Sequence, residues 1–134
     1  MTDDSGVEAL LEQWEGVYKK GLLSFWLLLL LHERPMYAFE MGEALDGASL
    51  GTVSADTKSL YRALRRFEAI GLVQSSWQSS ETGPSRRYYQ LTSLGVSLLR
   101  RFAERNILLF QEASIAARLS ALMDPHAEES LCCC

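Results

Sequence analysis

The sequence predicts a mainly α-helical protein that carries one small β-hairpin. Apolar residues recur every three or four positions over most of the chain, and the period changes to two only between Leu72 and Leu91. Of the 134 residues, 48% are hydrophobic and 22% are charged, which is ordinary for a folded chain. Because single domains commonly contain about 100–200 residues, we expect one domain with its own core.

Two helices are expected before residue 33. The first, Asp3–Tyr18, has apolar residues at spacings of three and four, and Gly21 is expected to be a break or a kink after it. The second, from about Leu22 to His32, is apolar all round and therefore needs burial on more than one side. Its apolar run is far shorter than the roughly 20 residues that cross a membrane, so no membrane association is expected.

Two further helices follow. Pro35 is well placed to open the first, Met36–Leu45, and its expected inward face comprises Met36, Phe39, Met41 or Gly42, and Leu45. Ser54 or Asp56 can cap the second, which should run to about Ile70 and stop at Gly71. Its expected buried face comprises Leu60, Ala63, Leu64 and Phe67.

The rest of the chain predicts a hairpin and a long helix. Two short strands, Leu72–Trp77 and Arg87–Leu91, are expected to be joined by a long polar tip, and Thr92 can cap a helix from Ser93 to about Met123. This order describes a winged helix-turn-helix with an N-terminal helix and a long C-terminal helix. The long helix is apolar on two sides and needs a partner beyond its own domain, so we expect it to be a dimerisation helix. The expected divisions are an N-terminal extension over 1–20, the winged helix-turn-helix over 21–92, the dimerisation helix over 93–124 and a flexible tail over 125–134.

The charges are distributed unevenly along the chain. The formal net charge of −4 argues against a polyanionic partner when it is taken alone. However, the window Asp56–Arg105 contains nine basic and four acidic residues, a net charge of +5, while the remainder carries −9. Such asymmetry indicates a charged partner better than the total does.

The basic window places its polar residues where a DNA-binding protein needs them. The helix ending near Ile70 leaves one face free of its buried set, and the N-terminal half of such a helix reads base edges in the major groove. Arg and Lys can bind guanine, while Thr and Tyr suit phosphates, and residues of the wing can follow the DNA backbone. The candidate DNA-binding residues are Thr57, Lys58, Tyr61, Arg62, Arg65, Ser85, Arg86 and Arg87.

Four stretches, in this order and spacing, resemble the PadR family of transcriptional regulators: Lys20–Leu23, Arg34–Met41, Ser59–Val73 and Gly83–Thr92. Three features depart from the usual pattern. Ala38 and Phe39 stand where the family usually has Gly-Tyr, Arg62 stands where proline is common, and an acidic helix precedes the usual start.

The resemblance implies a transcription factor, most often a repressor, that binds a pseudo-palindromic double-stranded DNA operator as a homodimer. The chain resembles the shorter branch of the family, in which one C-terminal helix from each subunit builds the dimer. The residues expected there are Leu98, Phe102, Leu109, Ala113 and Ala116. In this family the dimer interface sometimes encloses a pocket for a small aromatic effector. The candidates for it are Trp14, Trp26, Phe102 and Phe110, although the two tryptophans suit packing better.

No pattern of catalytic or cofactor-binding residues is present, so neither an enzyme nor a cofactor is expected. All three cysteines are terminal, Cys132–Cys134, and no signal peptide is evident, so a cytoplasmic protein is expected. The cysteines could sense oxidants or bind a soft metal, although three adjacent residues cannot complete a tetrahedral site alone. The alternative function is a winged-helix adaptor that binds a protein partner and not DNA.

Overall fold

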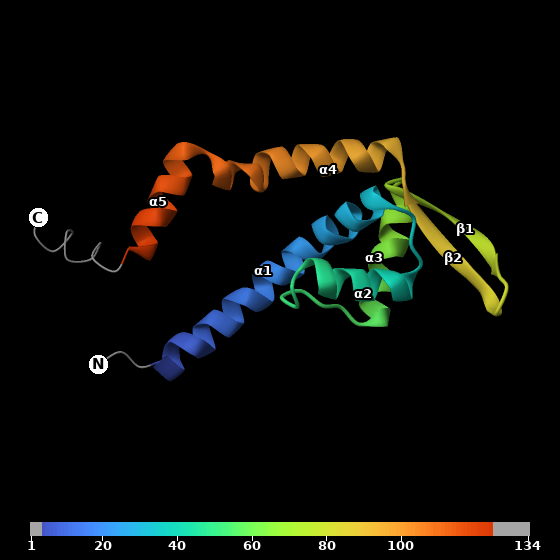
Figure 1. The fold of residues 1–134 in the computed structure, drawn as a ribbon, viewed down its shortest axis with the longest axis horizontal. Coiled ribbons are helices and arrows are strands. Elements are labelled where there is room, and N and C mark those ends of the chain that lie inside the picture. Colours follow the sequence, from blue (N-terminus) through green and yellow to red (C-terminus); the bar gives the residue numbers. More distant parts are fainter. Residues whose placement is uncertain (1–3, 125–134) are drawn as a thin grey trace, which may run out of the picture. The chain divides into compact units, whose positions relative to one another are not determined.

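The computed structural model describes residues 4–124 and confirms the mainly helical fold with one hairpin (Figure 1). The chain forms two compact units, Met1–Leu99 and Arg100–Cys134. In order, the elements are α1 (Asp4–Glu33), α2 (Ala38–Ala48), α3 (Thr57–Ala69), β1 (Val73–Ser80), β2 (Gly83–Leu91), α4 (Ser93–Asn106), the 3₁₀ helix η1 (Leu108–Gln111) and α5 (Ala113–Met123).

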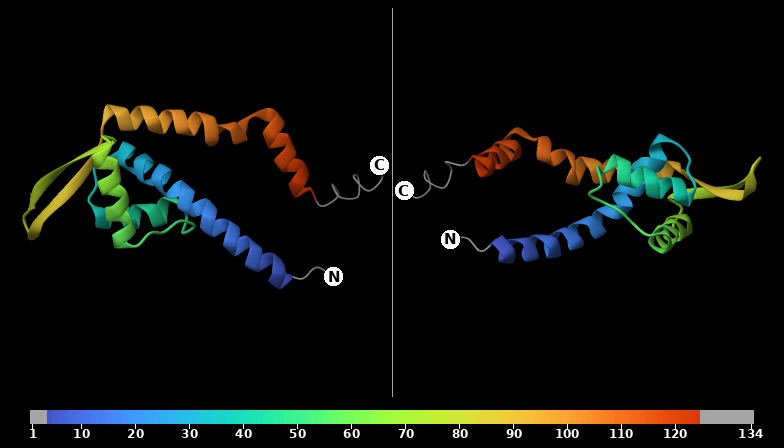
Figure 2. Two further views of the ribbon diagram at one scale, coloured as in Figure 1. Left: turned by 180° about the vertical axis from the view of Figure 1, so that it is seen from behind. Right: turned by 60° about the horizontal axis from the view of Figure 1, so that its bottom comes forward.

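Helix α1 is continuous, so the two helices predicted before residue 33 are one, and Gly21 does not break it. A glycine inside a helix costs only about 1 kcal/mol relative to alanine, and the segment after Gly21 gains more than that by packing. Leu27, Leu28, Leu30 and Leu31 are buried in the core, whereas the half before Gly21 is exposed. Figures 1 and 2 show this first half of α1 extending clear of α2 and α3.

Helix α2 begins at Ala38 and not at Pro35 as expected. The backbone of Met36 is extended because it pairs with β2: the Met36 amide donates to the Tyr89 carbonyl at 3.2 Å, and the Tyr89 amide donates to the Met36 carbonyl at 2.8 Å. The later start changes the inward face. Ala38, Met41 and Leu45 are buried, while Phe39, which was expected to face inward, is 67% exposed.

Helix α3 has the ends that its sequence predicts. The carboxylate of Asp56 accepts a hydrogen bond from the Ser59 amide at 2.8 Å and caps the first turn. At the other end, Gly71 has a φ of 86°, and the Leu72 amide donates to the Phe67 carbonyl at 2.8 Å. This Schellman arrangement needs a left-handed residue after the helix, which explains the glycine.

The hairpin is longer and has a tighter tip than expected. The strands pair antiparallel from Val73↔Leu91 to Ser80↔Gly83, with an irregularity between Gln78 and Ser80, so that only Glu81 and Thr82 form the turn. The predicted polar loop 78–86 is therefore mostly strand. Its side chains give no apolar alternation because the outer half of the hairpin has no core to cover.

One apolar core holds the first unit together. Helix α1 contacts α2 and β2, α2 contacts α3, and α3 contacts β1. The side chains buried most completely come from three helices and the segment before α2: Leu27, Met36, Met41, Leu45 and Leu64. This core fixes the exposed face of α3 and the base of the hairpin relative to each other.

The predicted single helix from Ser93 to Met123 is interrupted. Helix α4 ends at Asn106, whose side-chain amide donates to the Phe102 carbonyl at 3.2 Å and so competes for the last turn. Glu112 is extended, with a ψ of 137°, and α5 starts after it. None of the helices within residues 4–124 is long and apolar enough to cross a membrane. The cysteines Cys132–Cys134 and the predicted flexible tail lie outside the described residues.

Candidate nucleic-acid interface

Helix α3 separates its apolar and basic residues onto opposite faces. Leu60, Ala63, Leu64 and Phe67 are buried, as the sequence predicts. The candidate DNA-binding residues on this helix are all exposed: Thr57, Lys58, Tyr61, Arg62 and Arg65. Because the apolar face of α3 packs into the core, its basic face is turned toward solvent.

The first turn of α3 is stabilised by an ionised cap. The hydrogen bonds from Ser59 hold the pKa of the Asp56 carboxyl below its usual value, and the positive charges of Arg62 and Lys58 act in the same direction. Asp56 is fully exposed, so it remains negative at neutral pH. The cap thus sets the start of the helix from which Thr57 and Lys58 project.

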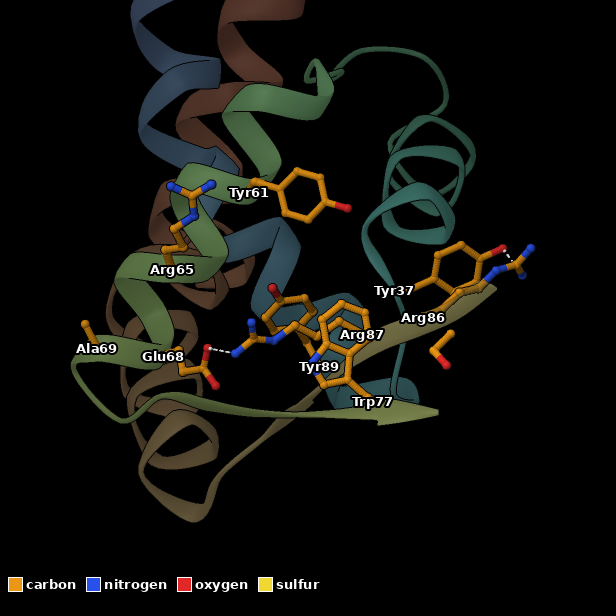
Figure 3. Close-up of a pocket in the computed structure, with 10 residues that line it drawn as sticks. Tyr37, Tyr61, Arg65, Glu68, Ala69, Trp77, Arg86, Arg87 and Tyr89 are labelled. Carbon is orange, nitrogen blue, oxygen red and sulfur yellow. Dashed lines mark hydrogen bonds and ion pairs between the residues drawn. The ribbon is translucent and has the colours of Figure 1, made fainter. Parts of the chain in front are cut away.

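The two wing arginines point to different helices. The Nη1 of Arg86 donates to the hydroxyl of Tyr37, just before α2, at 2.9 Å, and its guanidinium lies 4.6 Å from the centre of the Tyr37 ring. The Nη2 of Arg87 donates to Oε1 of Glu68 on α3 at 3.1 Å. Figure 3 shows both contacts as dashed lines.

A cleft of about 710 Å³ lies between α3 and the hairpin. One side of the cleft is lined by four residues of α3: Tyr61, Arg65, Glu68 and Ala69. The rest of the cleft is lined by Tyr37 and by five hairpin residues, Trp77, Ser85, Arg86, Arg87 and Tyr89 (Figure 3). The structure thus brings Tyr61 and Arg65 together with all three wing candidates. Thr57, Lys58 and Arg62 share the exposed face of α3 but do not line the cleft.

Five residues that line the cleft were not predicted from the sequence: Tyr37, Glu68, Ala69, Trp77 and Tyr89. Glu68 is the one acidic residue of the basic helix α3, and such an isolated carboxylate indicates a side-chain partner within the protein. Trp77 is 68% exposed, an unusual position for a large apolar side chain, and it pairs across the hairpin with Arg87. Tyr37 carries no signal by itself, because only the pairing of Met36 with Tyr89 brings it to the wing.

The two adjacent tyrosines of β2 have different environments, as strand alternation predicts. Tyr89 is 3% exposed and belongs to the core, and this burial raises the pKa of its phenol. Tyr88 is half-buried and meets the Tyr37 ring edge-on at 5.4 Å between centroids. The Tyr89 phenol is therefore neutral at physiological pH.

The candidate dimerisation residues are accessible to different degrees. Leu98 is 46% exposed, Phe102, Leu109 and Ala116 are half-buried, and Ala113 is exposed. On α1, Trp14 is 75% exposed, while Trp26 is half-buried against the core and contacts the Phe25 ring. Packing thus accounts for Trp26 within this chain but not for Trp14.

Comparison with known proteins shows which family has this arrangement. Residues 27–101, more than half of the chain, match the transcriptional regulator PadR-like family. The chain belongs to this family. The matched region runs from the buried half of α1 through the helix-turn-helix and the wing into α4, so it includes every candidate DNA-binding residue.

Solved PadR-like structures share the fold. A PadR-like transcription factor from Bacteroides fragilis is 29% identical, with a TM-score of 0.61, over 76% of this chain and 96% of that chain. A PadR-like regulator from Bacillus cereus is 23% identical, with a TM-score of 0.61, over 78% and 95% of the two chains. Bacillus subtilis PadR, solved in complex with operator DNA, is 18% identical, with a TM-score of 0.56, over 60% and 46%.

An uncharacterised protein from Lysinibacillus sphaericus is 25% identical over 80 residues, which are 60% of this chain and 73% of that protein. The matched family and the solved PadR-like structures are transcriptional regulators, as the resemblance in the sequence implies.

Proposed function

We propose that this PadR-like protein is a sequence-specific DNA-binding repressor that binds a pseudo-palindromic operator as a homodimer. The observation that carries the proposal is the exposed basic face of α3, which continues through Arg65 into the cleft beside the wing. The operator-bound structure of Bacillus subtilis PadR supports a DNA partner for this fold.

The proposed docking places α3 in the major groove. Arg62 and Arg65 are suited to guanine edges, and each bidentate contact of this kind is worth about 1–3 kcal/mol of discrimination. Thr57, Lys58 and Tyr61 lie on the same exposed face and are suited to the flanking phosphates. Ser85 and Arg86 of the wing contact the DNA backbone outside the major groove that α3 occupies.

The proposed dimer covers apolar side chains that the single chain leaves exposed. On α1 these include Val7, Leu10, Trp14 and Val17, all more than half exposed. On α4 Leu98 is 46% exposed, and the proposed interface extends from it to Phe102, Leu109, Ala113 and Ala116. Two-fold symmetry of such a dimer matches half-sites about one helical turn apart. A small aromatic effector bound between the two subunits belongs to the same proposal.

The first experiment is selection of DNA from a random duplex library with the purified protein. We expect the recovered sites to be pseudo-palindromic, with a half-site spacing of one turn or a multiple of it. Recovery of no enriched sequence, together with no retention on DNA-cellulose at low salt, would instead favour the protein-interaction adaptor.

The second experiment tests the role of α3 on the selected duplex. The double variant Arg62→Ala/Arg65→Ala should bind at least about tenfold more weakly in an anisotropy assay at fixed salt, with a flatter salt dependence. Arg118→Ala, an exposed position on α5, is the control and should bind like the wild type. The dimer should be intact in both. Unchanged affinity of the double variant would refute the assignment of α3.

A further inference from the structure

The arginines of the wing occupy opposite faces of the hairpin. Arg86 and Arg87 are adjacent in β2, and successive side chains of a strand point to opposite sides. One face therefore carries Arg87 with Ser75, Trp77 and Tyr89, and the other carries Arg86. Each arginine contacts a different part of the helix-turn-helix, so the two are not equivalent.

Arg87 closes a triangle of hydrogen bonds with α3. Its Nε donates to the hydroxyl of Ser75 at 2.8 Å, and its Nη2 donates to Oε1 of Glu68 at 3.1 Å. The Ser75 hydroxyl in turn donates to Oε2 of Glu68 at 2.6 Å. Both carboxylate oxygens are thus used, and two sides of the guanidinium are engaged within the protein.

Aromatic rings further confine Arg87. Its guanidinium carbon lies 5.9 Å from the centroid of the Trp77 ring and 5.9 Å from that of the Tyr89 ring. A planar guanidinium can bind a carboxylate and a hydroxyl while it lies against rings, whereas a lysine ammonium lacks this fork. The site is therefore specific for arginine, and its positive charge is balanced by Glu68.

Arg86 is in a different electrostatic position. Its contacts are the hydroxyl and the ring face of Tyr37, neither of which carries a negative charge. Within the described part of the chain no carboxylate forms an ion pair with it. Its charge is therefore uncompensated at the edge of the cleft, opposite Arg65 (Figure 3).

We propose that Glu68, Ser75 and Arg87 are positioning residues that fix the wing to α3, and that Arg86, not Arg87, is the wing arginine that binds a DNA phosphate. The second half of this proposal rests on the proposed function. The triangle sets the separation between the two walls of the cleft, and hence the distance from Arg65 to Arg86 across which one DNA strand would pass.

The positioning role is testable without DNA. Glu68→Ala removes the carboxylate from the triangle, while Glu81→Ala removes the same group from the exposed turn of the hairpin and is the matched control. Amide hydrogen exchange of the paired hairpin residues should accelerate about three- to tenfold in Glu68→Ala and should not change in Glu81→Ala. Unchanged exchange in Glu68→Ala would overturn the positioning role, whatever the DNA results.

The division of labour between the arginines is tested by salt dependence. Each phosphate contact contributes about 0.9 to the slope of log K against log salt concentration. Arg86→Ala should therefore lower the slope on the selected duplex by about one per protomer. The double variant Glu68→Ala/Arg87→Ala has the wild-type net charge and should keep the wild-type slope. A slope that falls as far in the double variant as in Arg86→Ala would overturn the proposal.

Specificity gives a readout that a loss of stability alone would not produce. The readout is the ratio of the affinity for the selected duplex to the affinity for an unrelated 30-base-pair duplex. Glu68→Ala should reduce this ratio by about tenfold while the melting temperature of the protein stays unchanged. Arg87→Lys keeps the positive charge but lacks the planar guanidinium, so it should lose specificity as Glu68→Ala does. If Arg87 instead acted only as a positive charge against DNA, the lysine variant should keep the wild-type specificity. If the wild type binds neither duplex, the proposed function fails, and the exchange experiment still decides the positioning role.

Discussion

Gly95 lies where the first turn of α4 approaches the backbone of Leu72, between α3 and β1. It is buried in the first turn of α4, and a Cβ built on it would overlap the carbonyl oxygen of Leu72. The same Cβ would lie 3.0 Å from Cδ2 and 3.1 Å from Cγ of the Leu91 side chain. Leu91 can adjust, but a backbone carbonyl cannot, so Gly95→Ala should displace the start of α4.

The displacement would weaken a set of hydrogen bonds around Thr92. Its amide donates to the Leu72 carbonyl at 3.0 Å, and its hydroxyl donates to the Gly71 carbonyl at 2.6 Å while it lies 3.0 Å from the Leu72 carbonyl. The same hydroxyl accepts from the Gly95 amide at 3.1 Å. Overpacking costs about 1–3 kcal/mol, and a weakened cap adds about 1 kcal/mol. Alanine regains about 1 kcal/mol of helix propensity. The net destabilisation is about 1–3 kcal/mol, or a fall in Tm of roughly 3–10 °C.

The matched control is Gly21→Ala. Gly21 is also helical, but a Cβ there meets no atom within 4 Å, so only the helix propensity changes. This variant should be more stable than the wild type by up to about 1 kcal/mol. Thermal unfolding by circular dichroism at equal protein concentration measures both. A Gly95→Ala protein as stable as the wild type would show that α4 does not approach Leu72 as closely as the structure indicates.

Three further outcomes are expected. Leu50 follows α2 with a φ of 56° and is 88% exposed, so Leu50→Gly should relieve strain without loss of burial and raise stability by up to about 1 kcal/mol in urea unfolding. The pKa of Asp56 is lower in the folded than in the unfolded state, so its cap stabilises the fold fully above the unfolded pKa, and this stabilisation is lost as pH falls through the folded pKa. An Asp56→Ser variant should therefore lose less stability than the wild type between pH 5 and 2 in an acid titration. Leu98→Glu should shift the proposed dimer to monomer in sedimentation at micromolar concentration, whereas Leu50→Glu, a control on an exposed turn, should not. Equal behaviour of the two variants would contradict an interface that includes Leu98.

The features that were predicted correctly depend on residues close together in the chain. Asp56 caps the turn that contains Ser59, and Gly71 ends the same helix in a left-handed conformation. The apolar period of α3 shows directly which side is buried. These properties follow from helix geometry, so the basic face of α3 was evident before the structure was known.

Two of the errors have a common cause in distant contacts. Pro35 did not start α2 because the backbone of Met36 pairs with Tyr89, more than fifty positions away. Gly21 did not break α1 because the packing of its second half outweighs the propensity of one residue. The outer part of the hairpin lacks alternation, so its pairing could not be read from the pattern of apolar residues.

The sequence by itself determined the helical fold with its wing, the resemblance to a family of regulators, and the concentration of positive charge between Asp56 and Arg105. Only the tertiary structure decided how those charges differ. Arg86 and Arg87 are neighbours with the same side chain, yet one lies on Tyr37 and the other pairs with Glu68. The reason is physical: strand alternation sends them to opposite faces, and the packing of two separate helices determines what each face meets.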